Sequence, residues 1–523
     1  MFALAIWDRR SRTLLLARDR IGIKPLYVFR DSRHLVFASE LKGMLADPAL
    51  PTALDLTALS NYLHLLSIPG PSSILEGVRR LEPGHYILAS EKGVIDRPYW
   101  DLRSGSQSKT SFDSACAQFD ERFADAVRSH LVSDVPVGAF LSGGVDSSSV
   151  VAVAARQLQS PIQTFSVTFP AFGEFDEGVY ARQVATHCAS RHFELELSAN
   201  IAETIPRIAW HADEPFAVSS AFALHELSRL AREHVKVVLT GDGADEVFGG
   251  YLWRHVDFPT LELPREVNRF LRVLERMSPS WFGRFLSALG GRSSTDPSIG
   301  TRYIDSFTVF KTADLGALLT ADYAQAVASA WTTNVTQRYF DSAPYGEQLA
   351  RKLFTDIKTT LVSEMLTKVD RMTMAHGLEA RVPFLDHELV EWAFRIPGEY
   401  KVRGRDGKAL VKRAMERYVP ADVLYRPKHG FNLPMRAWLR NELKPMLCDL
   451  LSTESVKRRG IFVPEQVEKL IAEHLSGEID HSNRLIVLLM LELWYTQFMD
   501  DRASFTKPPE STSARRASQH DWK

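Results

Sequence analysis

The chain has 523 residues, of which 45% are hydrophobic, 24% charged and 10% aromatic, and its formal net charge is −1. Because a single core stops growing near ~250–300 residues, we expect two domains with additions. The composition is that of a soluble globular protein, and the near-zero charge gives no sign of a nucleic-acid or membrane-surface partner.

Three widely spaced cysteines, Cys116, Cys188 and Cys448, form no CxxC pair and cannot build a zinc site or a disulfide framework. The N-terminal sequence MFALAIWDRR lacks both a basic segment and a cleavage site of small residues. The longest late apolar run, residues 485–491, is far shorter than the ~20 residues of a membrane span. We therefore expect a cytoplasmic protein with no membrane partner.

Short strands separated by turns are predicted from Met1 to about Trp100. The runs FALAIWD, RTLLLARD, PLYVFR, LVFASE and GHYILAS are rich in branched and aromatic residues. A helical segment, residues 56–66, interrupts the series. We predict a strand-rich N-terminal unit over residues 1–102, followed by a linker rich in Ser, Gly and Lys over residues 103–111.

Residues 112–501 are predicted to form a larger α/β domain. An amphipathic helix over residues 112–132 opens it, with Phe119 and Phe123 on its apolar face. Strands then alternate with helical segments, which indicates a doubly wound parallel sheet with ligands at the carboxyl ends of its strands. The strand candidates are residues 137–141, 163–168, 192–197 and 235–239.

The sequence beyond this sheet is less informative. Residues 254–347 are irregular, helical in places, and contain no recognisable motif. Helices are expected over residues 353–375 and 388–394, with HGLEARVPFLD between them, and VLYRPKHGFNLPMRAWL opens a final helical region. The tail, residues 502–523, is predicted to be disordered.

The stretch VGAFLSGGVDSSSVV places a glycine-serine turn between a strand and a helix. Glycines let backbone N–H groups approach an anion, and the N-terminal end of the helix favours phosphate. Ser142, Ser147 and Ser148 add hydroxyl donors. Asp146 would repel a polyphosphate unless a divalent cation lay between them. The turn therefore predicts a metal-assisted pyrophosphate site.

Two other motifs do not fit this turn. A Walker loop would need a lysine after the glycines, and a nucleophile elbow would need glycine at Phe140. SGGVDSSS, residues 142–149, instead matches the PP-loop of ATP pyrophosphatases, which split ATP between its α- and β-phosphates. An ordinary turn rich in Gly and Ser is the structural alternative.

A second polar loop, TGDGADEVFGGY, follows the apolar strand that ends at Leu239. We call these residues, 240–251, the acidic loop. Its glycines, aspartates and glutamate are suited to hold a metal and a reacting group, whereas a solvated acidic loop is the structural alternative. The rule for parallel sheets assigns ligand binding to the loops after Leu141, Val167 and Leu239.

Four motifs in order, VGAFLSGGVDSSS, TGDGADEVFGGY, KVDRMTMAHGLEARVPFLD and LYRPKHGFNLP, closely resemble those of glutamine-dependent asparagine synthetases. In that family, ATP and aspartate react in the PP-loop domain to give β-aspartyl-AMP and pyrophosphate, and ammonia then releases asparagine and AMP. The resemblance implies a ligase that uses ATP and Mg²⁺ and acts on small molecules. It also implies that a glutaminase-like domain of the N-terminal-nucleophile type precedes a C-terminal PP-loop domain.

The resemblance assigns roles to individual residues. Asp146 and Asp245 would share Mg²⁺ on the pyrophosphate, and Lys428 would neutralise charge on the departing pyrophosphate. Asp242 stands where some members carry a glutamate proposed to deprotonate ammonia, and its reach is one methylene shorter. The nucleotide would be held by Leu141, Ser142, Gly143, Gly144, Asp146, Ser147, Val167, Thr240 and Gly241.

Three residues of EARVPFLD, namely Glu379, Arg381 and Asp386, are candidates for binding the aspartate substrate. Arg381 and Asp386 could equally form a structural ion pair. Lys428, in the sequence RPKHGF, could likewise be an ordinary surface charge.

The N-terminal unit resembles the second half of the family's glutaminase domain, through MFALAIWD, ARDRIGIKPLYVF and FASELKGML. That domain uses an N-terminal cysteine as its nucleophile. Residue 2 is Phe2 and no cysteine precedes Cys116, so we assign no glutaminase nucleophile and expect no glutamine hydrolysis. We also expect a truncated N-terminus, because half a sandwich would leave strand edges and an apolar face uncovered.

Other functions stay open at this point. A related adenylating amide synthase, of the β-lactam synthetase or peptide macrocyclase type, would act on another carboxylate. A non-catalytic scaffold would be expected to lose Asp146 or the acidic loop, and both persist. An RNA-thiolating PP-loop enzyme would carry paired catalytic cysteines. The oligomeric state is not fixed by the sequence, which is compatible with a homodimer.

Overall fold

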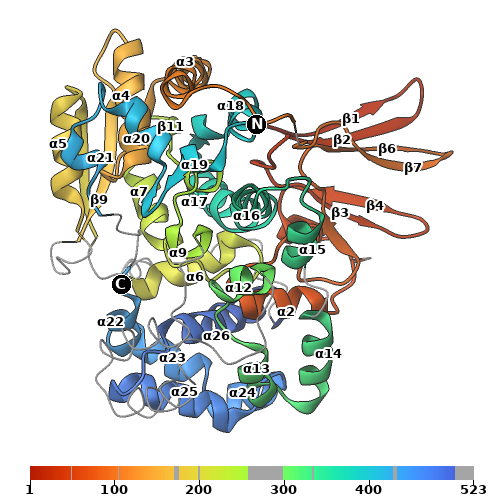
Figure 1. The fold of residues 1–523 in the computed structure, drawn as a ribbon. Helices are drawn as coiled ribbons and strands as arrows, with labels where there is room; N and C mark the ends of the chain where they lie inside the picture. Colours follow the sequence, from red (N-terminus) through yellow and green to blue (C-terminus); the bar gives the residue numbers. More distant parts are fainter. Residues whose placement is uncertain are drawn as a thin grey trace, which may run out of the picture.

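The computed structural model describes residues 1–48, 50–103, 105–169, 176–197, 201–256, 299–331, 335–427 and 433–500. The predicted tail, residues 502–523, and part of the region 254–347 lie outside these ranges. In the described parts, a parallel sheet is joined to a strand-rich N-terminal unit, and a helical region packs against both (Figure 1). The predicted α/β fold class is confirmed.

Two antiparallel sheets make up most of the N-terminal unit and project from one side of the molecule (Figure 1). Leu16, Val28 and Ile87 belong to a buried apolar cluster between the sheets. The first sheet has the order β1-β2-β6-β7 and the second the order β4-β3-β5. Their strands are β1 Ala3–Asp8, β2 Thr13–Arg18, β3 Tyr27–Arg30, β4 Leu35–Ala38, β5 Val78–Arg80, β6 His85–Ser90 and β7 Gly93–Pro98.

All the strands predicted in this unit are present, and two more were not predicted. The sequence of β5, VRR, is very short and mostly charged. The sequence of β7, GVIDRP, combines glycine, two charged residues and proline. Both strands are held by pairing with better strand formers, which a local pattern does not reveal.

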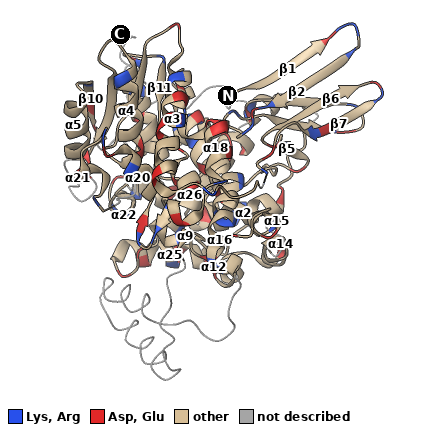
Figure 2. Ribbon diagram, turned by 45° about the horizontal axis from the view of Figure 1, so that its top comes forward, with Lys and Arg blue, Asp and Glu red and all other residues tan. Residues whose placement is uncertain are grey.

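An apolar row crosses the outer face of the first sheet. Ile6 pairs with Leu15, Leu15 with Leu88, and Leu88 with Ile95. Ile6, Leu88 and Ile95 are 54%, 37% and 45% exposed. Figure 2 shows these strands mostly in tan, with charged residues near the turns. The outer face of the first sheet is therefore apolar and partly exposed.

The predicted N-terminal helix is α2, Leu56–Leu65, and Asp55 caps its first turn. Buried Tyr62 of α2 donates a 2.8 Å hydrogen bond to the Val487 carbonyl in α26, Ser482–Tyr495. Helix α26 is apolar around most of its circumference, as expected for a helix inside a core. One hydrophobic cluster thus contains side chains of both the N-terminal unit and the C-terminal helices.

The parallel sheet has the order β10-β9-β8-β11-β12. Four of its strands are the predicted ones, with ends that differ by at most two residues. The strand order reverses between β8 and β11, so a crevice is expected at the carboxyl ends of these two strands. The strands are β8 Val137–Phe140, β9 Gln163–Thr168, β10 Arg191–Glu196, β11 Val237–Leu239 and β12 Glu379–Arg381.

Helices cover both faces of this sheet. Neighbouring residues of β8 show the two faces, because Ala139 belongs to the cluster formed with α3, α4 and α5, and Phe140 to the cluster formed with α7 and α17. Phe119 and Phe123 of α3 are fully buried, as predicted. The helices are α3 Phe112–Leu131, α4 Val145–Gln157, α5 Gly178–His187, α6 Ile201–Ala212, α7 Ala221–Arg232 and α17 Thr367–Met374.

The segment predicted as one helix over residues 353–375 is longer and is not uniform. It consists of α16 Gln348–Asp356, a π-helix η2 over Ile357–Leu366, and α17. The following segment contains the edge strand β12, although the sequence predicted only the connection HGLEARVPFLD there. The strand EAR holds two charged residues, and only its Ala380 is buried. π-Helical turns are rare in proteins, and those that occur are often found at functional sites.

The remaining elements are mostly helical. Those within the irregular region include α12 to α15, which agrees with the expectation of helices there. In the described parts, no helix combines the length and the apolar character needed to cross a membrane. The elements are α1 Leu41–Met44, α8 Ala244–Phe248, α9 Leu252–His255, α12 Ile299–Asp305, α13 Thr312–Leu318, α14 Ala321–Trp331, α15 Val335–Ser342, η3 Pro383–Leu385, α18 His387–Ala393, α19 Gly398–Lys401, β13 Val402–Arg403, β14 Asp406–Gly407, α20 Ala409–Met415, α21 Ala421–Leu424, α22 Met435–Arg440, α23 Lys444–Leu450, α24 Thr453–Arg459, α25 Pro464–Ser476 and η4 Thr496–Asp500.

Candidate active site

A cavity of about 660 Å³ opens at the carboxyl ends of β8, β9 and β11. This is the point at which the strand order reverses, where ligands of such sheets bind. Gly143 is not part of the lining, but its carbonyl accepts from the guanidinium of Arg426, which is. The predicted residues that line the cavity are Leu141, Ser142, Gly144, Asp146, Ser147, Val167, Thr240, Gly241, Asp242 and Asp245.

The PP-loop turn is held in shape by its own hydroxyl groups. The Ser142 backbone N–H donates to Ser147 Oγ at 3.1 Å, and the two serine hydroxyls lie 3.1 Å apart. Gly143 has a φ of +71°, and a β-carbon there would lie 2.6 Å from the Ala181 nitrogen. Only glycine fits this close and left-handed position.

The acidic loop touches the PP-loop directly. A β-carbon on Gly241 would lie 2.7 Å from the Ser147 nitrogen and 2.8 Å from Asp146 Cβ. A β-carbon on Gly250 would overlap Asp245 Oδ1. The glycines of the acidic loop therefore permit close contacts with the PP-loop and around the Asp245 carboxylate.

Lys408 joins Asp146 to Asp245. Its Nζ lies 2.6 Å from Asp146 Oδ2 and 2.8 Å from Asp245 Oδ1, and the residue is only 4% exposed. Burial by itself would lower the pKa of Lys408, but Asp146 and Asp245 raise it above its ordinary value. Lys408 was not predicted from the sequence, because its segment, RDGKALVKR, is far along the chain from both the PP-loop and the acidic loop.

The same pair of carboxylates fits a divalent cation. Asp146 and Asp245 face a single cationic nitrogen, so their oxygens converge on one point. The described residues include no group of three or more His, Cys, Asp or Glu able to hold a metal. Mg²⁺ in phosphate-transfer sites is commonly held by one or two carboxylates, with phosphate oxygens and water as further ligands. The donor set therefore suits Mg²⁺ that arrives with a nucleotide.

Asp242 faces a cation of its own. Asp242 Oδ1 lies 3.5 Å from Lys368 Nζ on α17, and both residues line the cavity. The Asp242 backbone N–H donates to Thr240 Oγ1 at 3.4 Å. The carboxylate is thus held at the cavity wall opposite a lysine that sequence reasoning did not single out.

Two further acidic groups beside the cavity were also missed. Burial, with Asp245 nearby, raises the pKa of Glu246 to about 7, and Tyr251 donates a 2.8 Å hydrogen bond to Glu246 Oε1. Burial raises the pKa of Glu364, in the π-helix η2, to about 8. Their unusual environment depends on burial, which the sequence does not display.

The three candidates for aspartate binding do not line this cavity. Arg381 donates to Glu379 Oε1 at 2.6 Å and to the His130 carbonyl at 2.8 Å. Asp386 caps α18 by accepting from the Glu388 and Leu389 N–H groups. The ion-pair partner of Arg381 is therefore Glu379 rather than Asp386, and the assignment of these residues to aspartate binding stays a prediction.

Lys428 lies outside the described residues. The residues just before it, Arg426 and Pro427, line the cavity. Arg426 lies 2.5 Å from Glu177 Oε1 and stacks on Tyr180, with 4.3 Å between its guanidinium carbon and the ring centre. The chain that leads to Lys428 is thus attached beside the PP-loop.

Comparisons with known proteins agree with these features. A family model described as asparagine synthase matches residues 118–496, and one described as a glutamine amidotransferase domain matches residues 1–100. A putative glutamine-hydrolysing asparagine synthetase of Mycobacterium tuberculosis is 36% identical over 516 residues, which cover 96% of this chain and 77% of the relative.

Two other relatives extend the comparison. Glutamine-hydrolysing asparagine synthetase 1 of Bacillus subtilis is 31% identical over 507 residues, covering 96% of this chain and 78% of the relative. Amidase chyE of Penicillium rubens is 27% identical over 528 residues, which cover 90% of this chain and 75% of the relative. The family inferred from the four motifs is confirmed, and the chain belongs to the asparagine synthase family of ligases.

Proposed function

We propose that the protein forms asparagine from aspartate and ATP through β-aspartyl-AMP, with release of AMP and pyrophosphate. The observation that carries this proposal is the contact between the PP-loop and the acidic loop, in which Gly241 lies against Ser147. A phosphate-binding turn and a pair of carboxylates thereby share one cavity. The membership in the asparagine synthase family supports the same reaction.

In the first step, an oxygen of the aspartate β-carboxylate attacks the α-phosphorus of ATP, and the bond to the β-phosphate oxygen breaks. The Ser142 and Ser147 hydroxyls and the first turn of α4 hold the phosphates. Asp146 and Asp245 would hold Mg²⁺, whose charge neutralises the phosphate oxygens. Lys408 and Lys428 add positive charge for the pyrophosphate that leaves.

In the second step, the ammonia nitrogen attacks the acyl carbon, the carbon–oxygen bond to AMP breaks, and asparagine is released. The nitrogen loses one proton in this step. We assign that proton to the Asp242 carboxylate, which Lys368 holds at the cavity wall.

We propose that residues 1–523, taken by themselves, use free ammonia as the nitrogen source. Its 523 residues contain no cysteine before Cys116. Burial raises the pKa of both Cys116 and Cys188 to about 11, so little of either thiol is the reactive thiolate at neutral pH. Cys448 lies on α23, in the C-terminal helical region. These positions give no thiol suited to attack glutamine within the N-terminal unit.

The test is ATP–pyrophosphate exchange with a panel of carboxylates. Aspartate is expected to stimulate exchange, and added ammonium is expected to divert the acyl adenylate to asparagine. Exchange stimulated only by another carboxylate would instead assign the chain to an amide synthase of the β-lactam synthetase or macrocyclase type. No exchange with any carboxylate would favour a non-catalytic scaffold.

A further inference from the structure

Helix α17 connects the cavity with the N-terminal unit. Near its start, Lys368 faces Asp242 in the cavity. Two residues later, Asp370 Oδ1 lies 2.7 Å from Nζ of Lys24, in the N-terminal unit. The next residue, Arg371, lies 3.2 Å from Glu40 of the same unit. A displacement of the N-terminal unit would therefore act on the helix that carries Lys368.

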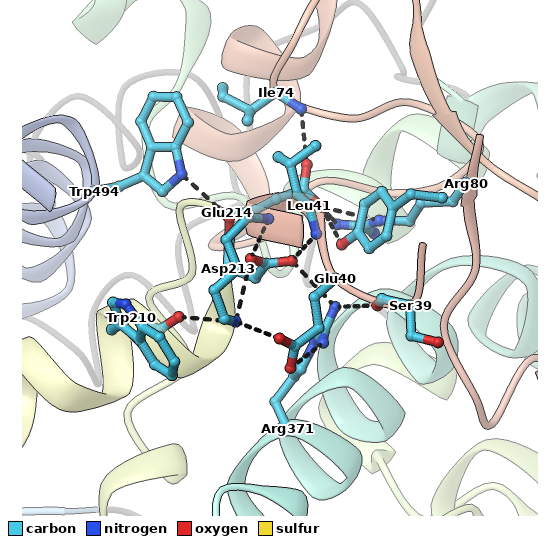
Figure 3. A network of polar contacts seen from close by, with 12 residues as sticks. Ser39, Glu40, Leu41, Ile74, Arg80, Trp210, Asp213, Glu214, Arg371 and Trp494 are labelled. Carbon is cyan, nitrogen blue, oxygen red and sulfur yellow. Dashed lines mark hydrogen bonds and ion pairs between the residues drawn. The ribbon is translucent and has the colours of Figure 1, made fainter. Parts of the chain in front are cut away.

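Figure 3 shows that Arg371 also belongs to a buried polar network at this junction. Arg371 Nη2 donates to the Ser39 carbonyl at 2.9 Å and lies 3.4 Å from Asp213 Oδ2. Asp213 is fully buried and follows α6 with a φ of +75°, a conformation that few residues other than glycine adopt. Its carboxylate accepts from the backbone N–H groups of Leu41 and Lys42, at the start of α1.

Glu214 fixes the neighbouring strands in the same way. It accepts a 2.6 Å hydrogen bond from Tyr27 Oη and a 2.8 Å bond from the Ile74 N–H, and it pairs with Arg80. Burial would raise the pKa of Glu214, but Arg80 and Tyr27 hold it below its ordinary value. The N-terminal unit thus surrounds two adjacent carboxylates of the PP-loop domain (Figure 3).

The hydrogen bonds and ion pairs of Asp213 and Glu214 are buried, and each requires a particular orientation of its partner. A carboxylate that loses its partners in such a place is left uncompensated, so the network resists sliding of one unit on the other. An apolar interface would allow small shifts at lower cost. The N-terminal unit therefore fixes the position of α17, because charged hydrogen bonds tolerate only small changes in distance and angle.

We propose that Asp213 and the Lys24–Asp370 pair are positioning residues for amide formation, because they hold α17 where Lys368 meets Asp242. The inference rests on the proposed function in one respect, the assignment of the ammonia proton to Asp242. The N-terminal unit then serves the second step of the reaction, and its contribution does not require glutamine hydrolysis.

The Lys24–Asp370 pair gives the sharpest test, since the Lys24 side chain is 21% exposed and its replacement leaves Asp213 paired with Arg371 and Glu214 paired with Arg80. The variants are Lys24→Met, Asp370→Asn and the exchange of both, Lys24→Asp with Asp370→Lys. The control is Arg12→Met, which breaks an ion pair with Glu91 in the same unit, where both side chains are 70% exposed.

Two rates are measured on the full chain: aspartate-dependent ATP–pyrophosphate exchange, and asparagine formation at saturating ammonium. Lys24→Met and Asp370→Asn are expected to leave exchange within about twofold and to lower asparagine formation about tenfold, since a misplaced general base costs less than its complete loss. The exchanged pair is expected to recover most of the loss, and Arg12→Met to change neither rate.

Equal reductions of both rates would show a purely structural role and overturn the positioning inference, as would unchanged rates in both variants. In that case the proposed function would stand, because the unmodified protein still shows aspartate-dependent exchange. No exchange in the unmodified protein would refute the proposed function together with the inference that rests on it.

Discussion

Gly241 lies so close to Ser147 that a β-carbon at position 241 would stand 2.7 Å from the Ser147 nitrogen. Because that nitrogen belongs to the first turn of α4, the acidic loop and the PP-loop turn form one surface. Neither loop can move away from the other without opening the cavity.

The variant Gly241→Ala is expected to separate the loops. The added methyl group must displace backbone atoms of α4, so the free energy of unfolding should fall by about 1–3 kcal/mol, as for other overpacked sites. ATP affinity should fall about tenfold or more, measured by isothermal titration calorimetry. Gly316→Ala in α13 is the control, since a β-carbon there meets no atom within 4 Å. Normal ATP binding by Gly241→Ala would contradict the shared surface.

Lys408 and a divalent cation are expected to compete for the same two carboxylates. In Lys408→Met, Asp146 and Asp245 face each other without the ammonium, which should destabilise the nucleotide-free protein by about 3 kcal/mol. Millimolar Mg²⁺ should restore more of the melting temperature in Lys408→Met than in the unmodified protein, measured by differential scanning calorimetry. The control is Lys412→Met, whose partner Asp406 is 41% exposed. An equal response to Mg²⁺ in all three proteins would argue against a shared cation position.

The raised pKa of Glu364 predicts a pH dependence of stability. Burial raises this pKa from 4.5 to about 8, so the folded protein binds the proton more tightly than the unfolded chain. The stabilising contribution is complete below pH 4.5 and is lost as the pH rises through about 8. Glu364→Gln should therefore raise the free energy of unfolding at pH 8.5 by on the order of 4 kcal/mol, with a change below about 1 kcal/mol at pH 5.

Urea unfolding at both pH values measures this difference, and comparison with the unmodified protein cancels the other titrating groups. Glu121→Gln, at an exposed position of α3, is the control and should show no such divergence. A constant difference between Glu364→Gln and the unmodified protein across the pH range would show that Glu364 titrates normally.

The nitrogen source can be tested directly on this polypeptide. Ammonium is expected to support asparagine formation, and glutamine at the same concentration is expected to give none, because no cysteine precedes Cys116. The measurement is chromatographic detection of asparagine, with glutamate as the second product to be monitored. Cys116→Ala should leave the ammonium-dependent rate unchanged. Equal rates with glutamine and ammonium would refute the assignment of ammonia.

The strands and both loops of the site could be predicted because their signals are local. The PP-loop follows an apolar run within a few residues, and β9 has the predicted bounds, Gln163–Thr168. Lys408 could not be predicted, since its contact with Asp146 joins residues 262 positions apart. Edge strand β12 was hidden for a related reason, because its pairing with β11 rather than its own residues makes it a strand.

The presence of a family motif also did not show which of its side chains face the cavity. Glu379, Arg381 and Asp386 belong to a segment that resembles the family closely, yet none of them lines the cavity. Which side chains of a motif face a ligand depends on the turn that follows the strand. In this chain the turn places Asp386 at the start of α18 and Leu385 against Gly243.

Substitution of Asp242 should distinguish the two chemical steps, adenylation and amide formation. Asp242→Asn removes the proposed proton acceptor but keeps the size of the side chain, so asparagine formation should fall by about 10²–10⁴-fold. Aspartate-dependent ATP–pyrophosphate exchange should persist, because that step transfers no proton to residue 242. Asp242→Glu restores a carboxylate with one more methylene and should recover part of the rate. Lys368→Met should lower the same step without abolishing exchange, since the carboxylate remains but loses the ammonium 3.5 Å away. If Asp242→Asn lost exchange and asparagine formation in equal measure, residue 242 would belong to ATP or aspartate binding and the proton acceptor would have to be another carboxylate of the cavity.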